Sequence, residues 1–264
     1  MSKTAKRRRS RAQARRPAQQ TRARTPAATP ADRRRRPRPI VRHVAAAALG
    51  TALVGLFWAT RPSWSGEMRL WKAVGDAAFV LLLITLCLGP LARIARPVSA
   101  LLPWRRQFGI WFALVATLHS VLVIHGWARW GLRRFLGYEI VPQLGREARM
   151  EPGFGLANLV GVVALVFALV LAATSSDRAL RRLGASAWKW LHHSALFVFY
   201  LSLLHAGYFL FLHYTASFHK QIPRPDWFRM PFVILGAGLL ALQGIAFVKT
   251  AGRPTTRTVG VSGG

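Results

Sequence analysis

The sequence is poor in acidic residues and in cysteine. Eight Asp and Glu residues stand against 38 Lys and Arg residues, which gives a formal net charge of +30. The single cysteine, Cys87, excludes an intramolecular disulfide, an iron–sulfur cluster held by four cysteines and covalent cofactor attachment through a C-x-x-C-H motif. The sequence also lacks a G-x-G-x-x-G fingerprint and a P-loop, so the common nucleotide-binding motifs are absent.

Apolar side chains, by contrast, make up 52% of the sequence, and only 17% of its residues are charged. A strongly basic chain is typical of nucleic-acid-binding proteins, whereas a chain this apolar is typical of membrane proteins. Residues 1–42 hold 16 of the basic residues and one acid, Asp32, and so carry +15, half of the net charge. The two features therefore belong to different parts of the chain.

Residues 1–42 are rich in Arg, Pro and Ala, and the first large apolar side chain after Met1 is Ile40. Such a segment cannot bury enough apolar surface to offset its ordering entropy, so we expect a disordered cytoplasmic tail. It serves as a topology signal in this interpretation, and binding to acidic membrane lipids is an alternative. No folded module that reads bases accompanies the charge, so we expect no nucleic-acid partner.

Uncharged stretches long enough to cross a bilayer recur through the rest of the chain. The sequence predicts an all-α, polytopic membrane bundle over residues 43–250, followed by a short cytoplasmic tail at 251–264. Its six transmembrane helices are expected at about 43–60, 73–91, 107–128, 154–174, 190–212 and 231–249.

Lys and Arg in the connecting segments predict the orientation. The basic tail, the loop at 92–106 and the loop at 175–189 lie on one side of a six-span bundle, and each carries several basic residues. The outer loops also hold basic residues, but there they are mixed with acids. We therefore expect a multi-pass protein of the inner (plasma) membrane with both termini in the cytoplasm.

Five of the eight histidines fall at membrane depth: His119, His125, His192, His193 and His205. Ionisable groups there are costly and usually functional, although a neutral histidine bonded to a neighbouring helix is the simple alternative. At 1.5 Å per residue, His119 lies about 18 Å and His205 about 22 Å from the inner ends of their helices. Two imidazoles at matching depth can hold one b-type haem iron from both sides, so the sequence predicts this pair as ligands.

Other residues extend the predicted site. Gly126 shares a helix face with His119 and leaves room for a flat ring, and His125 is an alternative ligand. His192 lies near the inner surface, where a second haem would lack an obvious partner on the third helix. Arg105 and Arg106 are candidates to pair with haem propionates or a flavin phosphate, and ordinary positive-inside charge is the alternative.

Three segments between about residues 70 and 215 resemble a known family. Residues 105–119, RRQFGIWFALVATLH, resemble the third helix of ferric reductase-like transmembrane domains. Residues 85–93, TLCLGPLAR, and 174–192, TSSDRALRRLGASAWKWLH, are similar to the haem-binding membrane subunit of the bacterial periplasmic methionine sulfoxide reductase system. His119, His192 and His205 match the histidine positions of that family.

The resemblance implies an electron-transfer subunit of an oxidoreductase system rather than a complete enzyme. Such a protein binds haem b, one or two per chain, and some relatives also carry FMN. It takes electrons from quinol or a cytoplasmic flavin reductase and passes them to a periplasmic redox partner. The alternatives are the membrane component of a ferric or other metal reductase with a separate flavin partner and, in a different class, a haem-free transporter or membrane scaffold.

Overall fold

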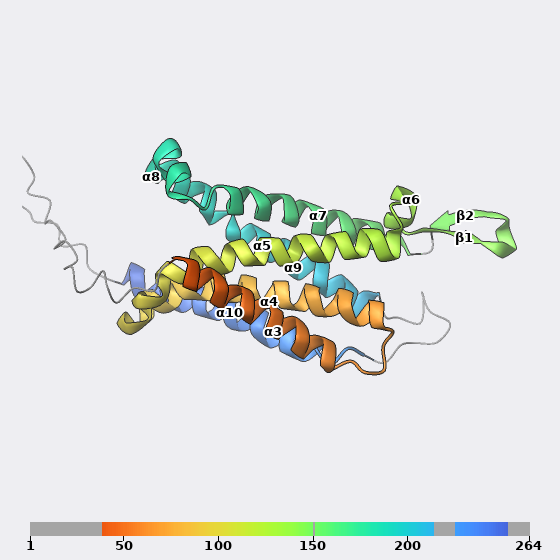
Figure 1. Ribbon diagram of the computed structural model, residues 1–264, viewed down its shortest axis with the longest axis horizontal. Coiled ribbons are helices and arrows are strands. Elements are labelled where there is room, and N and C mark those ends of the chain that lie inside the picture. Colours follow the sequence, from red (N-terminus) through yellow and green to blue (C-terminus); the bar gives the residue numbers. More distant parts are fainter. Residues whose placement is uncertain (1–38, 150, 214–224, 253–264) are drawn as a thin grey trace, which may run out of the picture. The chain divides into compact units, whose positions relative to one another are not determined.

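A computed structural model describes residues 39–149, 151–213 and 225–252, which form a bundle of long helices (Figure 1). Within these residues six helical stretches are long and apolar enough to cross a membrane. They are Pro39–Ala59, Gly66–Ile94, Arg96–Ala128, Gly153–Ala173, Asp177–Leu212 and Arg229–Ala251. The prediction of an all-α bundle with six membrane-spanning segments is thereby confirmed.

The first two helices are longer than the sequence predicted. Helix α3 (Pro39–Ala59) begins at a proline, whose fixed backbone suits the first turn, so residues 39–42 of the expected tail are helical. Residues 1–38 lie outside the described part of the chain. Helix α4 (Gly66–Ile94) begins about two turns before the predicted start at residue 73. The Ser65 side chain caps it by accepting a hydrogen bond from the Met68 N–H.

The predicted inner loops are wrong, because both contain helix. Residues 92–106 hold the 3₁₀ helix η1 (Arg96–Trp104), and residues 175–189 fall within α8 (Asp177–His193). Ser176 caps α8 by accepting a hydrogen bond from Ala179 N–H, and a kink interrupts the helix at Gly184, where φ is +76°. Basic and apolar residues alternate in α8 at helical spacing, as they do in helices that lie along a membrane surface.

The remaining elements complete the bundle. The third span continues from α5 (Arg105–Leu122) into a short π-helix, η2 (Val123–Ala128), and the fourth is α7 (Pro152–Ala173). The fifth span is broken at Ser194, where α8 ends and α9 (Ala195–Gly207) begins, and it finishes in the π-helix η4 (Tyr208–Leu212). Helix α10 (Arg229–Ala251) is the sixth.

A small β-hairpin lies outside the predicted spans, between α5 and α7. After α6 (Leu132–Phe135), strands β1 (Tyr138–Val141) and β2 (Arg146–Arg149) pair antiparallel, with Tyr138 opposite Arg149. The turn between them contains η3 (Pro142–Leu144). Figure 1 shows the hairpin at the end of the bundle opposite α8, so the two ends of the membrane helices differ in structure.

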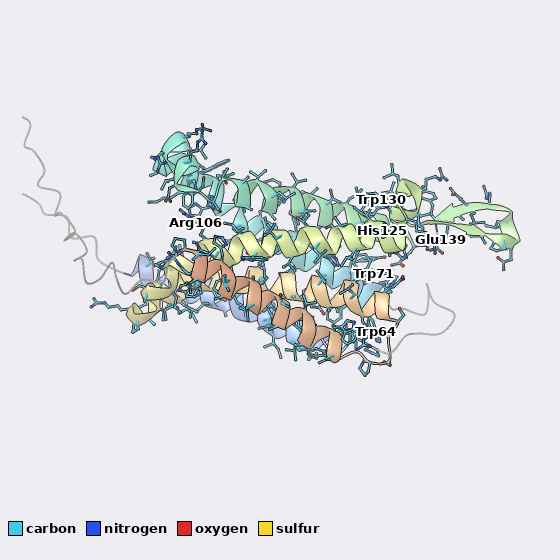
Figure 2. The ribbon with its side chains drawn as sticks, in the orientation of Figure 1. Trp64, Trp71, Arg106, His125, Trp130 and Glu139 are labelled. Atoms are coloured by element: carbon cyan, nitrogen blue, oxygen red, sulfur yellow. The ribbon has the colours of Figure 1, made fainter. Side chains whose placement is uncertain are left out.

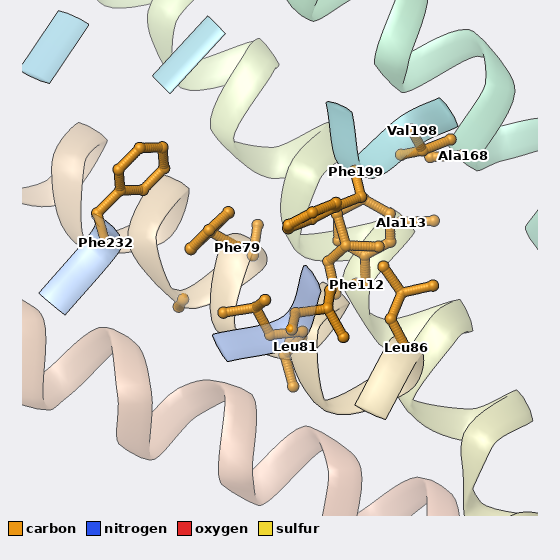
Figure 3. Packing of buried hydrophobic residues seen from close by; sticks show 14 of the residues in the cluster. Phe79, Leu81, Leu86, Phe112, Ala113, Ala168, Val198, Phe199 and Phe232 are labelled. Carbon is orange, nitrogen blue, oxygen red and sulfur yellow. The ribbon is translucent and has the colours of Figure 1, made fainter. Parts of the chain in front are cut away.

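Helix α4 is the centre of the bundle and packs against α3, α5, α9 and α10. Its buried side chains meet aromatic rings from three neighbouring helices (Figure 3). The ring centre of Phe79 lies 4.9 Å from that of Phe232 and 6.4 Å from that of Phe199. This aromatic core joins the middle of α4 to the N-terminal parts of α9 and α10 and fixes the positions of the three helices.

A buried ion cluster ties three segments together beside the core. The Arg61 guanidinium, in the connection after α3, lies 2.5 Å from the Asp76 carboxylate of α4 and 3.0 Å from Asp226, which precedes α10. Burial alone would raise the pKa of Asp226. The charges of Lys72 and Arg61 and a hydrogen bond from Phe228 N–H outweigh burial, and the pKa is lowered. Asp226 is therefore ionised at neutral pH and pairs fully with Arg61.

Removing the shared cation should destabilise the bundle. We expect Arg61→Ala to lower the free energy of unfolding by about 3–5 kcal/mol, because two buried carboxylates would lose their common partner. Unfolding of the purified protein in detergent measures the effect. Arg146→Ala, which removes an exposed arginine of the hairpin, is the control and should change stability little; equal effects of the two substitutions would contradict this role for Arg61.

Candidate cofactor site

A cavity of about 410 Å³ lies among α4, α5, α7 and α9. Its volume falls within the range of pockets that hold small-molecule cofactors. Helices at its wall contribute small residues, among them Gly75, Ala116, Gly161 and Ala206, beside aromatic rings such as Phe79. His119 and His205 both line it. The walls near His119 and His205 are thus mostly apolar.

His119 and His205 face each other across this cavity. Their ring centres are 6.4 Å apart and their ring planes are inclined by 78°. His119 comes from α5 and His205 from α9. The structure therefore brings together the two histidines that the sequence predicts at matching depths in the membrane.

Backbone carbonyl groups hold both rings in one tautomer. His119 Nδ1 lies 3.0 Å from the carbonyl oxygen of Trp71, and His205 Nδ1 lies 2.8 Å from that of Ala157. A carbonyl oxygen only accepts hydrogen bonds, so each Nδ1 carries the proton and donates it. Each Nε2 is then left unprotonated, with a lone pair that can bind a metal ion.

Two glycines, which the sequence analysis did not select, make room for the rings. A Cβ atom added at Gly75 of α4 would lie 3.0 Å from His119 Cε1, and one added at Gly161 of α7 would lie 2.7 Å from His205 Nδ1. Any larger residue at Gly161 would have to displace the imidazole. Each histidine therefore packs against the bare backbone of a neighbouring helix. A glycine is too common for sequence reasoning to single out without knowing which helices are adjacent.

The geometry fits a metal ion held from both sides. Two imidazoles bonded to one metal ion at about 2 Å each have ring centres roughly 6 Å apart, close to the observed 6.4 Å. Within the described residues no group of three or more His, Cys, Asp or Glu side chains could hold a metal ion. A planar macrocycle that supplies the other ligands to its iron would need only two imidazoles from the protein, and His119 and His205 are the residues that could hold it.

Gly126 and His125, the two residues of η2 predicted to belong to the site, do not lie beside the imidazole pair. A Cβ atom at Gly126 would collide with the indole of Trp71, so this glycine accommodates a tryptophan that lines the cavity. His125 Nδ1 accepts a hydrogen bond from the Trp130 indole at 3.2 Å. Figure 2 shows His125, Trp130 and Trp71 at the hairpin end of the bundle. His125 does not line the cavity.

His192, Arg105 and Arg106 lie away from the cavity, at the α8 end of the bundle, where Figure 2 shows Arg106. The His192 ring stacks on Trp188 with ring centres 4.0 Å apart, and its Nε2 lies 3.4 Å from the Thr174 hydroxyl. Arg106 forms an ion pair with Asp177 at 2.7 Å. The structure thus separates His192 from the imidazole pair.

Polar groups that the sequence analysis missed line the outer part of the cavity. Glu151, at the start of α7, accepts a hydrogen bond from the Tyr208 hydroxyl, and its other carboxylate oxygen lies 2.8 Å from His213 Nδ1. Lys72 and Asp76 line the wall formed by α4. The sequence could have indicated Lys72 and Asp76, because two charged residues four positions apart in an apolar helix share one face.

Comparison with known proteins places the chain in a family. Residues 74–203 match the model of the ferric reductase like transmembrane component. Two relatives named protein-methionine-sulfoxide reductase heme-binding subunit MsrQ align over most of their length. The protein from Pectobacterium carotovorum subsp. carotovorum is 33% identical over 61% of this chain and 70% of its own. That from Klebsiella pneumoniae subsp. pneumoniae is 31% identical over 71% of this chain and 82% of its own. The chain belongs to the MsrQ family.

Membership of the MsrQ family confirms the resemblance that the three sequence segments indicated, and it agrees with a multi-pass membrane protein. The matched region begins in α4 and ends two residues before His205. It therefore includes His119 and His192. No solved structure matches the chain significantly.

Proposed function

We propose that this protein binds a b-type haem between His119 and His205 and carries electrons across the inner membrane to a periplasmic acceptor. The observation that carries the proposal is the pair of facing imidazoles, 6.4 Å apart, whose Nδ1 atoms are both engaged with backbone carbonyls. The name of the MsrQ relatives, a heme-binding subunit of a methionine sulfoxide reductase, supports both the cofactor and the class of acceptor.

The protein's part in this function is to hold the ligands rigidly. The Trp71 and Ala157 carbonyls fix the tautomer and the direction of each ring, and such bonds also raise the basicity of the ligating nitrogen. When bound, haem supplies a one-electron carrier inside an otherwise insulating bilayer. Two histidine ligands leave no open position on the metal, which favours outer-sphere electron transfer over binding of oxygen or substrate.

The orientation we propose has both termini in the cytoplasm. The α8 end of the bundle carries Arg178, Arg181 and Arg182 in addition to the basic residues of η1 and its flanks, as the positive-inside rule expects of a cytoplasmic face. The hairpin end is then periplasmic. Quinol in the membrane or a cytoplasmic flavin reductase would donate the electrons, and a methionine sulfoxide reductase is the proposed acceptor.

The α8 end offers a second, weaker candidate for cofactor binding. Arg106, next to Arg105, pairs with Asp177, the first residue of the helix that carries His192. These two arginines remain our proposed partners for the acidic groups of a second haem or of FMN near His192. The proposed transfer from the imidazole pair to the acceptor does not depend on that cofactor.

The ligand assignment predicts the spectra of three variants. The purified full chain should show a low-spin b-type haem spectrum, confirmed by pyridine haemochrome analysis. His119→Ala and His205→Ala should each abolish it, because each removes one of two axial ligands, whereas His125→Ala should retain it. A full spectrum in both ligand variants would sink the pairing, and absence of haem from the wild type would favour the transporter or scaffold.

The glycine packing predicts a second loss. Gly161→Ala should reduce haem content at least tenfold, because its new methyl group would occupy space that the His205 ring now fills. Gly238→Ala, on α10, is the matched control, because a Cβ atom there meets nothing within 4 Å. The ratio of haem absorbance to protein measures both, and equal haem content in the two variants would argue against this packing role.

The orientation is tested with reporter insertions at two open glycines. Alkaline phosphatase inserted at Gly145 of the hairpin should be active, since that enzyme requires the periplasm to form its disulfides. The same enzyme inserted at Gly184 of α8 should be inactive. The opposite pattern of activities would invert the proposed direction of electron transfer.

A further inference from the structure

Lys72 lines the cavity that holds the two imidazoles. Among the described residues that line this cavity it is the only Lys or Arg, whereas three carboxylates, Asp76, Glu139 and Glu151, also line it. Its side chain is only 16% exposed. A lysine so placed within a membrane bundle needs a partner, because a desolvated ammonium group is costly.

The protein supplies Lys72 with little hydrogen bonding. The ammonium forms one ion pair, with Asp226 Oδ2 at 3.4 Å, and no hydrogen bond to the described residues. Asp226 is already engaged: it accepts hydrogen bonds from Nε and Nη2 of Arg61, at 3.2 and 3.0 Å, and from the Phe228 N–H at 3.1 Å. An ammonium group has three donors, so Lys72 retains unused donors beside the cavity.

The buried carboxylates around the cavity are, by contrast, already paired. Asp76 accepts a hydrogen bond from Arg61, and Glu151 is held by Tyr208 and His213. Glu139 is exposed on β1. A ligand with its own carboxylate would therefore find, among the described residues of this cavity, one Lys or Arg with donors left over, Lys72.

We propose that Lys72 binds a propionate carboxylate of the haem and so positions it between the two histidines. The inference rests on the proposed function, which supplies the ligand. Haem is apolar across its face and carries two carboxylates at one edge. The cavity has largely apolar walls, and among its described lining residues Lys72 is the one Lys or Arg that could pair with such a carboxylate. Lys72 is a positioning residue, and it does not ligate the iron.

A comparison of haem with haem dimethyl ester, whose propionates are uncharged, tests this directly. Membranes containing the full chain without haem are titrated with each compound, and the low-spin absorbance gives the affinity. We expect Lys72→Gln to bind haem about tenfold more weakly than the wild type, the effect of one lost charge-assisted hydrogen bond. With the ester, the two proteins should bind equally.

Two further variants separate pairing from a general effect of charge. Lys72→Arg should restore most of the affinity for haem, because a guanidinium also pairs with a carboxylate. Arg69→Gln removes a cation from the same helix whose guanidinium packs over Trp58 and does not line the cavity, and it should bind haem as the wild type does.

Two outcomes would overturn the inference. Equal weakening of Lys72→Gln toward haem and toward its ester, including complete loss of both, would show that Lys72 supports the protein structure instead of a propionate. Unchanged affinity for haem would show that it makes no contact. A wild type that gives no low-spin spectrum with either compound would instead overturn the proposed function, and this inference with it.

Discussion

The site depends on two hydrogen bonds from histidine rings to backbone carbonyls. The Nδ1–H groups of His119 and His205 are donated to Trp71 on α4 and Ala157 on α7, so four helices must be correctly packed before either ring is fixed. The same packing places Gly75 and Gly161 against the rings. The free Nε2 atoms, their spacing and the space between them all follow from this arrangement.

Charges inside the bundle are placed where they are paired, because burial in an apolar environment is costly without a partner. Arg61 joins Asp76 and Asp226 and thereby ties α4 to the segments after α3 and before α10. Lys72 lies one helical turn from Asp76, and its ion-pair partner, Asp226, also pairs with Arg61. Arg61 is fully paired and has a structural role, whereas Lys72 is only partly paired and can still bind a ligand.

Sequence reasoning predicted the six spans and brought His119 and His205 together, because hydropathy and the rise per residue of a helix are local properties. It did not predict α8, because the arginines of that segment indicated a loop between two spans, and it did not predict the hairpin at 138–149. Gly75 and Gly161 were missed for another reason: their roles depend on which helices are neighbours. Lys72 and Asp76 did leave a signal, because they are charged residues on one face of an apolar helix. Gly126, chosen for its lack of a side chain, lies against Trp71 instead of facing the imidazoles.

In the proposed function, His119 and His205 are the two ligands of one haem. Electron paramagnetic resonance of the oxidised, purified chain tests it most directly, because the spectrum of ferric haem reports its axial ligands. We expect a low-spin species with two imidazole ligands that is unchanged in His192→Ala. A high-spin species in the wild type, or loss of the low-spin signal in His192→Ala, would contradict it.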